Sequence, residues 1–476
     1  MAMQSRTLSS FGGMRQDRND YISSPDTSPD ACNMDTRDGC LTVAKGFSPA
    51  VANQAPSGGR LSRLYGYIGP GGLKFLACAG ASLYACDSAT GTWTQLCTLQ
   101  SDPGERKVDF LPVKIGAKEY VLIAHGGGQM FKWDGVSAAA ESFGSAQMLS
   151  NAAVNFVEPY YGRLFAAGDA AAPARLYWSK TPGDDRTIED WRSADASADV
   201  SGGFADIGTD SDPITGLMAL SNQLLIFKRD SLYRLLGDRP TNYRILPVDA
   251  AYTRPAHTAC VRYADRLYFL TATGLCFFDG QTVRRPNNFR ALCRLLAGCS
   301  LDACEAVACG DMLYFAVRES DPVYNDAVIE YDLMRGTFMV RRGFTVAGMT
   351  AVRGTLYVLT GEGKLEKFDD SPTYDGQPIR AWWETPRFDL GNKHVKKALG
   401  ELACTGHGDP VRVTVKTGGT GYPMTLTFPN DDDSAAETIL RGEGRVFRLR
   451  LENIDGGHFT LDAGVTLRFD AQLRPE

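Results

Sequence analysis

The sequence lacks any long apolar run. Its first segment, Met1–Asn19, is polar, carries Arg6, Arg15 and Arg18, and has no apolar stretch of the kind found in a secretory signal. A membrane-spanning helix needs roughly 20 predominantly apolar residues, and no stretch approaches that length. We therefore expect a protein that has no membrane span and is made in the cytoplasm.

Catalytic and phosphate-binding motifs are also missing. There is no Gly-x-Ser-x-Gly elbow, no Walker loop and no dinucleotide-binding fingerprint. None of the histidines is spaced as in a metal site or a catalytic triad: His125, His257, His394, His407 and His458. His125 precedes three glycines, but no helix follows to offer its N-terminus to a phosphate, so the segment predicts a hairpin turn. We expect no enzyme activity, no catalytic residue, no cofactor and no metal.

The cysteines do not form a metal-binding pattern. No Cys-x-x-Cys occurs, and Cys32 and Cys40 are too far apart for half of a zinc site, with no histidine near them. Several others alternate with hydrophobic residues in predicted strands: Cys78, Cys86, Cys276 and Cys309. Since free cysteine behaves as a small hydrophobe, we expect reduced thiols in the core.

A strongly basic region is absent as well. The chain has 50 basic and 56 acidic side chains, for a net charge of −6. The densest basic groups are Lys393 with Lys396 and Lys397, Arg284 with Arg285, and Arg341 with Arg342. We expect these to be solvated faces and not phosphate sites. Because phosphate contacts dominate DNA affinity, an acidic chain would allow DNA to pass without binding it.

An internal repeat is the most informative feature that is present. A turn residue followed by leucine and an aromatic or aliphatic residue recurs, with the leucines at Leu224, Leu267, Leu313 and Leu356. The intervals are 43, 46 and 43 residues. Repeats of ~40–50 residues are typical of the four-stranded blades of β-propellers.

A second recurring element marks hairpins within the repeat. It joins an aromatic residue to an Asp turn, as in Trp133-Asp134-Gly135 and Phe278-Asp279-Gly280. Asp caps such turns through local backbone hydrogen bonds, and Gly accepts the positive φ that they need. Seven units can be drawn, with six as the alternative: 61–98, 106–145, 152–206, 212–249, 256–292, 303–342 and 344–370. We predict an all-β protein with a six- or seven-bladed β-propeller over residues 56–375.

The third unit is longer than the others. It contains an Ala-rich run, Ala166–Ala174, and a polar segment, Lys180–Asp199. Function is often carried by such loops on a rigid scaffold. A functional insertion and a plain surface loop are equally compatible with this pattern.

The two flanks differ from the repeat. Residues 1–55 are rich in Asp, Ser, Gly and Pro, and could not bury enough surface to fold alone. We predict an extended N-terminal arm that packs on the propeller or on a neighbouring subunit, with Phe11 and Phe47 as candidate interface anchors; a disordered tail is the alternative. Residues 376–476 contain alternating strands such as Val411–Val415 and Val465–Phe469, which predict a C-terminal β-sandwich.

Motifs spread along the chain carry a resemblance. Near the N-terminus these are Phe11-Gly12-Gly13, Asn33-Met34-Asp35 and Gly46-Phe47; the fourth unit adds Asp212–Leu217 and Leu224–Gly237; the end adds Trp383–Gly391 and Lys396-Lys397. In this order they resemble the tail-hub, nozzle or packaged-DNA stabilisation proteins of short-tailed bacteriophages. The order of these motifs along the chain carries the resemblance.

The resemblance implies a structural virion protein. Its expected form is a homohexameric ring below the portal and its adaptor, which extends the DNA channel and helps to retain packaged DNA until ejection. The implied partners are the portal adaptor and other tail proteins such as fibres or spikes, with DNA passing through without specific binding. Two alternatives are a carbohydrate-binding or glycan-cleaving propeller in a host-contact device, which would use paired carboxylates, and a generic cellular scaffold.

Overall fold

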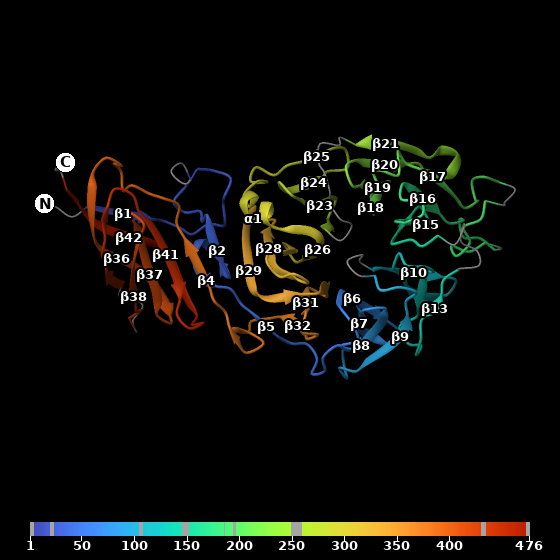
Figure 1. Cartoon of the computed structure of the whole chain (residues 1–476), viewed down its shortest axis with the longest axis horizontal. Coiled ribbons are helices and arrows are strands. Elements are labelled where there is room, and N and C mark those ends of the chain that lie inside the picture. The colour runs from blue at the N-terminus through green and yellow to red at the C-terminus, as the bar shows by residue number, and fades with distance from the viewer. Residues whose placement is uncertain are drawn as a thin grey trace.

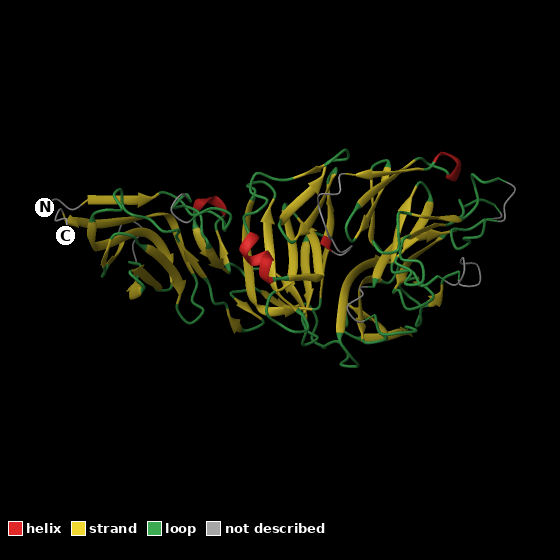
Figure 2. Ribbon diagram, turned by 45° about the horizontal axis from the view of Figure 1, so that its top comes forward, coloured by secondary structure: helices red, strands yellow, loops and turns green. Residues whose placement is uncertain are grey.

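The chain folds into two β-rich domains that lie side by side (Figure 1). The computed structural model describes residues 4–19, 23–103, 108–144, 152–184, 186–193, 197–248, 259–429 and 435–472. Strands dominate these residues, which contain one short α-helix, α1 (Cys293–Gly298), and 3₁₀ turns such as η1 (Arg37–Gly39) and η4 (Pro240–Asn242) (Figure 2). No helix in the described part of the chain is long and apolar enough to cross a membrane.

Seven antiparallel sheets form the propeller. Blade 1 comprises β6 (Leu61–Gly69), β7 (Gly72–Ala79), β8 (Ser82–Asp87) and β9 (Trp93–Thr98), and blade 2 comprises β10 (Asp109–Ile115), β11 (Lys118–Ala124), β12 (Phe131–Trp133) and β13 (Glu141–Ser142). Blade 3 comprises β14 (Phe156–Tyr160), β15 (Arg163–Ala167), β16 (Arg175–Trp178) and β17 (Gly203–Asp206). Blade 4 comprises β18 (Ile214–Leu220), β19 (Gln223–Lys228), β20 (Leu232–Leu236) and β21 (Arg244–Val248). Each is a four-stranded meander, as the turn-leucine repeat predicts.

Blades 5 to 7 continue the ring and close it. Blade 5 comprises β22 (Cys260–Tyr263), β23 (Arg266–Thr271), β24 (Gly274–Phe278) and β25 (Val283–Arg284). Blade 6 comprises β26 (Ser300–Cys309), β27 (Met312–Arg318), β28 (Asn325–Asp332) and β29 (Thr337–Val346). Blade 7 comprises β30 (Gly348–Val352), β31 (Thr355–Leu359) and β32 (Leu365–Phe368), together with β5 (Phe47–Pro49). The fourth strand of blade 7 thus comes from the N-terminal segment. A hairpin of β33 (Thr373–Tyr374) and β34 (Gln377–Pro378) extends this sheet. The structure therefore has seven blades, and the prediction of an all-β propeller is confirmed.

Hydrophobic clusters fill the spaces between neighbouring blades. Leu122 of blade 2 packs with Leu164 of blade 3, and Leu225 of blade 4 packs with Phe269 of blade 5, in two such clusters. A further cluster joins blade 7 to blade 1, which completes the circle. Each blade buries both faces only when it has two neighbours, so closure of the ring stabilises every blade.

The innermost strands are also joined by hydrogen bonds from one blade to the next. In each case a side-chain oxygen accepts a backbone N–H of the following blade. The pairs are Asp109 Oδ2 with Val157 N at 3.0 Å, Glu158 Oε1 with Ala219 N at 2.9 Å, Glu305 Oε2 with Met349 N at 2.6 Å, and Thr350 Oγ1 with Gly66 N at 3.2 Å. Charge-assisted bonds to buried carboxylates are stronger than neutral ones, so they fix the spacing of the blades.

The polar insertion of blade 3 is held by one buried cation. Arg163 is 1% exposed, and its guanidinium donates hydrogen bonds to the carbonyl oxygens of Ser179, Ser201 and Asp199. Trp191, inside the insertion, is fully buried. The described part of the predicted loop is therefore packed against its own blade.

The second domain is a sandwich of two sheets, as predicted for the C-terminal residues. One sheet contains β3 (Met34–Asp35), β4 (Leu41–Val43), β42 (Phe459–Gln472), β36 (Lys396–Gly408) and β39 (Ala436–Ile439), with β1 (Gln4–Leu8) and β40 (Glu443–Gly444) attached. The other contains β2 (Asp30–Cys32), β35 (Trp382–Glu384), β41 (Arg448–Asn453), β37 (Val411–Thr417) and β38 (Thr420–Leu426). Figure 1 shows the blue N-terminal strands among the red C-terminal ones.

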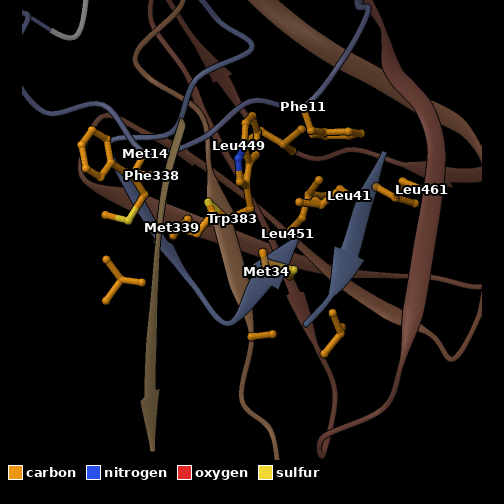
Figure 3. Close-up of a cluster of buried hydrophobic side chains, with 14 of the residues drawn as sticks. Phe11, Met14, Met34, Leu41, Phe338, Met339, Trp383, Leu449, Leu451 and Leu461 are labelled. Carbon is orange, nitrogen blue, oxygen red and sulfur yellow. The ribbon is translucent and has the colours of Figure 1, made fainter. Parts of the chain in front are cut away.

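The N-terminal segment is extended, as predicted, but it packs on its own chain. Strands β1 to β4 belong to the sandwich and β5 belongs to the propeller. Figure 3 shows Phe11, Met14 and Met34 among Trp383 of the sandwich and Phe338 of blade 6. The boundary expected near residue 55 therefore separates no independent arm, because the sandwich and blade 7 are incomplete without these strands.

Closure of blade 7 buries a carboxylate that should make stability depend on pH. Glu366 on β32 lies opposite Val358 and Pro49, is fully buried, and has no hydrogen-bond partner among the described residues. Burial, and then Asp375, raise its pKa from 4.5 to about 7, against the opposing charge of Lys364. This group's contribution to stability is full below about pH 4.5 and falls as the pH rises to about 7.

The variant Glu366→Gln should therefore be more stabilised relative to wild type at pH 8 than at pH 5. The rise in the pKa of Glu366 corresponds to roughly 3 kcal/mol in the free energy of unfolding, or a few degrees in melting temperature. Thermal unfolding of both proteins at the two pH values measures the difference. Glu362→Gln, in the same blade with its side chain 76% exposed, is the control and should show no such pH dependence. An equal effect of Glu366→Gln at both pH values would contradict a raised pKa for Glu366.

Candidate functional site

The histidine segment that was considered for phosphate binding is a turn. His125 is 1% exposed, and burial lowers the pKa of its imidazole. Gly127 N donates to Nδ1 at 3.3 Å, so Nε2 carries the proton and donates to the carbonyl oxygen of Gln129 at 3.0 Å. His257 lies outside the described residues. Across the described ranges, no three His, Cys, Asp or Glu side chains gather as a metal site requires.

The cysteines are free thiols in core or half-buried positions. Cys78, Cys86 and Cys276 are buried, and Cys309 is half-buried. Burial raises the pKa of the Cys86 thiol to about 12 and that of Cys97 to about 11. Thiols with such pKa values stay protonated at neutral pH, and protonated thiols are weak nucleophiles.

Two side chains of the basic groups are buried, so the prediction of a solvated face is wrong for Arg341 and Lys397. Arg341 is 8% exposed and pairs with Glu330 at 2.5 Å between Nε and Oε1. Lys397 is 2% exposed, and its Nζ donates to the carbonyl oxygens of Asp389 and Asn392. Both cations are buried because nearby acceptors replace their hydration. The signal missed in the sequence is their alternation with apolar residues on the same strands.

Asn33 links four segments at the junction of the two domains. Its Nδ2 donates to the carbonyl oxygens of Arg342 at 2.9 Å and Arg380 at 2.7 Å, while Oδ1 accepts from Arg342 N at 2.9 Å and from the Tyr374 hydroxyl at 3.0 Å. Its φ is +53°, a left-handed conformation that Asn adopts more readily than most residues. The N-terminal segment is thereby fixed to blade 6, the β33–β34 hairpin and the interdomain linker.

The two candidate anchors are buried at this junction, where they pack on other segments of the same chain. Phe11 is 3% exposed, with its ring 5.2 Å from that of Trp383, whose Nε1 donates to Gly12 O at 3.0 Å. Phe47 is 1% exposed and stacks on Tyr374 at 4.8 Å. Neither ring is available to a neighbouring subunit. Their partners lie more than 300 residues away in the sequence, so no local pattern could identify them.

A charged sheet face is the most distinctive surface beside this junction. The outward side chains of β35, β37 and β41 form a network of ion pairs on the sheet β2-β35-β41-β37-β38. Arg412 pairs with Glu452 at 3.2 Å, and Arg450 pairs with Glu452 at 2.8 Å and with Asp30 at 3.3 Å. The alternation of the strands places all these side chains on one face, opposite the buried Val411, Val413 and Val415.

Glu384 lies at the centre of this face beneath three cations. Its side chain is 4% exposed, with Lys416 Nζ at 2.5 Å, Arg448 Nη1 at 3.1 Å and Arg450 Nη1 at 3.9 Å. The carboxylate is covered while the cations above it remain partly exposed. The surface presented to a partner is therefore more positive than the count of charges suggests.

Two hollows flank the charged face. The larger, of about 670 Å³, lies at the domain junction and is lined by Arg380, Trp382, Arg412, Asp455 and neighbouring residues. The smaller, of about 380 Å³, has three basic residues in its lining, Arg387, Lys416 and Arg448. Arg380 has no ion-pair partner among the described residues. This arrangement can attract an anionic surface, because guanidinium groups bind carboxylates and phosphates with directed hydrogen bonds.

Comparisons with known proteins give only distant matches. No protein-family model and no curated protein matches the sequence. BamB from Moraxella catarrhalis aligns with 77% of this chain and 98% of its own, at 14% identity and a TM-score of 0.39. A chain of the mitotic checkpoint complex aligns with 68% of this chain and 95% of its own, at 11% identity and a TM-score of 0.43. The strand pairing of this chain itself defines its seven blades and its sandwich.

Removal of the Phe47 ring should open the propeller. Phe47→Ala deletes a fully buried aromatic side chain from the closing strand, which costs about 3–5 kcal/mol. We expect a marked fall in melting temperature and faster backbone hydrogen exchange in β32. Phe204→Ala removes the same ring from a site that is 47% exposed on blade 3 and should change the melting temperature little. If the two variants melt alike, Phe47 does not hold the ring closed.

Proposed function

We propose that this chain is a structural subunit of a bacteriophage tail, forming a ring that serves as a hub or nozzle below the portal and its adaptor. The observation that carries the proposal is where the motifs of the resemblance lie. Phe11-Gly12-Gly13 contacts Trp383, and Asn33 bonds to blade 6 and the linker before Trp383. Motifs separated by hundreds of residues thus form one structural unit, which supports a shared architecture over independent coincidences.

The architecture suits a mechanical role. Seven blades joined by buried hydrogen bonds and hydrophobic clusters make a stiff body. The sandwich is tied to this body by the N-terminal segment, so a force on one domain is transmitted to the other. A component that holds the exit of a pressurised head needs stiffness of this kind more than chemistry.

The charge of the chain also fits a channel protein. A net charge of −6 disfavours tight binding of DNA, because affinity for DNA depends on cations that replace counterions at its phosphates. DNA could therefore slide through a ring of such subunits during ejection. Arg341 and Lys397, which belong to the densest basic groups of the sequence, are buried and do not add to a DNA-binding surface.

The proposal is tested in the phage that encodes the chain. We expect mass spectrometry of gradient-purified particles to detect the protein, and electron microscopy to show it as a hexameric ring below the portal. Particles assembled without it should lose their DNA, and expression of the wild-type chain in trans should restore retention. Absence of the chain from purified particles, or retention of DNA without it, would refute the proposal.

A glycan-binding protein of a host-contact device is the second candidate. The observation that favours it is the larger hollow, where Trp382 lies close to Glu452 and Asp455. Aromatic faces and carboxylates are common in sugar sites, but this hollow lies at the domain junction and not on a propeller face. Binding of purified protein to a glycan array, lost in Trp382→Ala, would support this candidate, and absence of binding would remove it.

A further inference from the structure

The sandwich sheet that contains β36, β39 and β42 presents an acidic outer face. Four carboxylates project from β36, β39 and β42, with one arginine among them: Glu401, Glu437, Asp462, Asp470 and Arg468. Lys396 at the start of β36 adds one positive charge, which Glu443 on β40 neutralises at 3.0 Å. Arg468 is already paired with Glu401 at 2.6 Å. His407 lies 3.6 Å from Asp462 and both are exposed. The described part of this face therefore carries a net negative charge at neutral pH.

The other sheet of the sandwich, β2-β35-β41-β37-β38, presents a basic face on the opposite side. Together with its rim it carries six basic and four acidic side chains: Arg380, Arg387, Arg412, Lys416, Arg448 and Arg450 against Asp30, Glu384, Glu452 and Asp455. Glu384 is buried beneath its partners. The outer faces of a sandwich point away from each other, so these two cannot meet within one chain.

We propose that the basic face of one copy docks on the acidic face of the next copy, so that the sandwiches join head to tail. This inference rests on the proposed function, since it assigns the contact between subunits of the ring. The occupant of each face is a second copy of this chain because the two faces are complementary in charge. A head-to-tail contact repeats around a ring and closes when its rotation closes.

An exposed apolar side chain lies on the acidic face, on its edge strand β39. Ile439 is 75% exposed, lies opposite Glu401 in register, and is flanked by Glu437. Burial of this side chain under a neighbouring copy removes apolar surface from water and adds affinity. The charges beside it fix the partner and the register.

Charge reversal on single faces tests the contact. Arg380→Glu/Arg412→Glu makes the basic face acidic, and Glu437→Lys/Asp462→Lys makes the acidic face basic. All four side chains are exposed, and Arg380 and Glu437 have no ion-pair partner among the described residues. Each double variant alone should self-associate at least about tenfold more weakly than wild type at low salt, because like charges then meet. Light scattering coupled to size exclusion measures the assembly.

A mixture of the two double variants provides the decisive measurement. Every contact in the mixture again joins opposite charges, so we expect alternating assemblies of wild-type size to form from proteins that fail alone. A contact between two like faces would give a different result, since one of the variants would still assemble by itself. Raised salt should weaken the wild-type and mixed assemblies together.

A matched control comes from the propeller. Lys114→Glu/Lys118→Glu makes the same change of charge at exposed positions of blade 2, and assembly should stay as in wild type. Assembly of either face variant at wild-type strength, or a wild-type protein that stays monomeric at all concentrations, would overturn the inference. Loss of DNA binding without loss of assembly in Arg380→Glu/Arg412→Glu would assign the basic face to nucleic acid instead. Detection of the chain in phage particles is independent of these outcomes, so failure of the contact and failure of the proposed function are distinguishable.

Discussion

The pairing of β5 with β32 is the contact on which the rest of the structure depends. It consists of three residue pairs, of which Phe47 with Phe368 is the most buried. Ser48 Oγ also donates to Asp369 Oδ2 at 2.5 Å, across 321 residues of sequence. Without β5, blade 7 would expose its outer edge and the aromatic cluster around Tyr374. The closed ring is what allows each blade to bury both of its faces, so a short strand stabilises the whole propeller.

The same segment couples the propeller to the sandwich. Strands β1 to β4 are part of the sandwich, and the chain then enters blade 7 as β5 before it runs around the ring and returns through β35. Asn33 sits where these paths meet, and all its side-chain hydrogen-bonding partners belong to other segments. The sandwich cannot rotate away from the propeller without breaking these bonds or pulling on β5. Two domains of different architecture thus behave as one mechanical part.

The sequence predicts the features that depend on local physics. The spacing of Leu224, Leu267, Leu313 and Leu356 reports the second strand of blades 4 to 7 directly, because each of these blades repeats the same turn and the same buried leucine. The alternation of residues 411–415 predicts a half-buried strand for a similar reason. The number of blades stays at six or seven in the sequence because the first and third units are less regular than the others. The strand that the last blade takes from the other end of the chain has no local signal at all.

Features that depend on distant partners could not be predicted in this way. The rings of Phe11 and Phe47 looked like exposed anchors because their own segment is polar, and only the fold supplies the partners that bury them. Arg341 and Lys397 looked solvated because their acceptors, Glu330 and the carbonyl groups of Asp389 and Asn392, are not identifiable from charge alone. The charged faces of the sandwich come from strands far apart in sequence, so neither appears as a cluster of charges along the chain.

Use of the N-terminal strands within the chain limits how copies can join. Addition of a strand to a sheet edge is one route, but the edge strand β38 contains Pro423, which has no N–H to donate, and the edge strand β39 has only four residues. Both edges are therefore poor templates for a neighbouring strand. The outer faces of the sandwich remain, and they carry opposite net charges. In the proposed ring, a contact between unlike faces gives every copy the same orientation relative to the next.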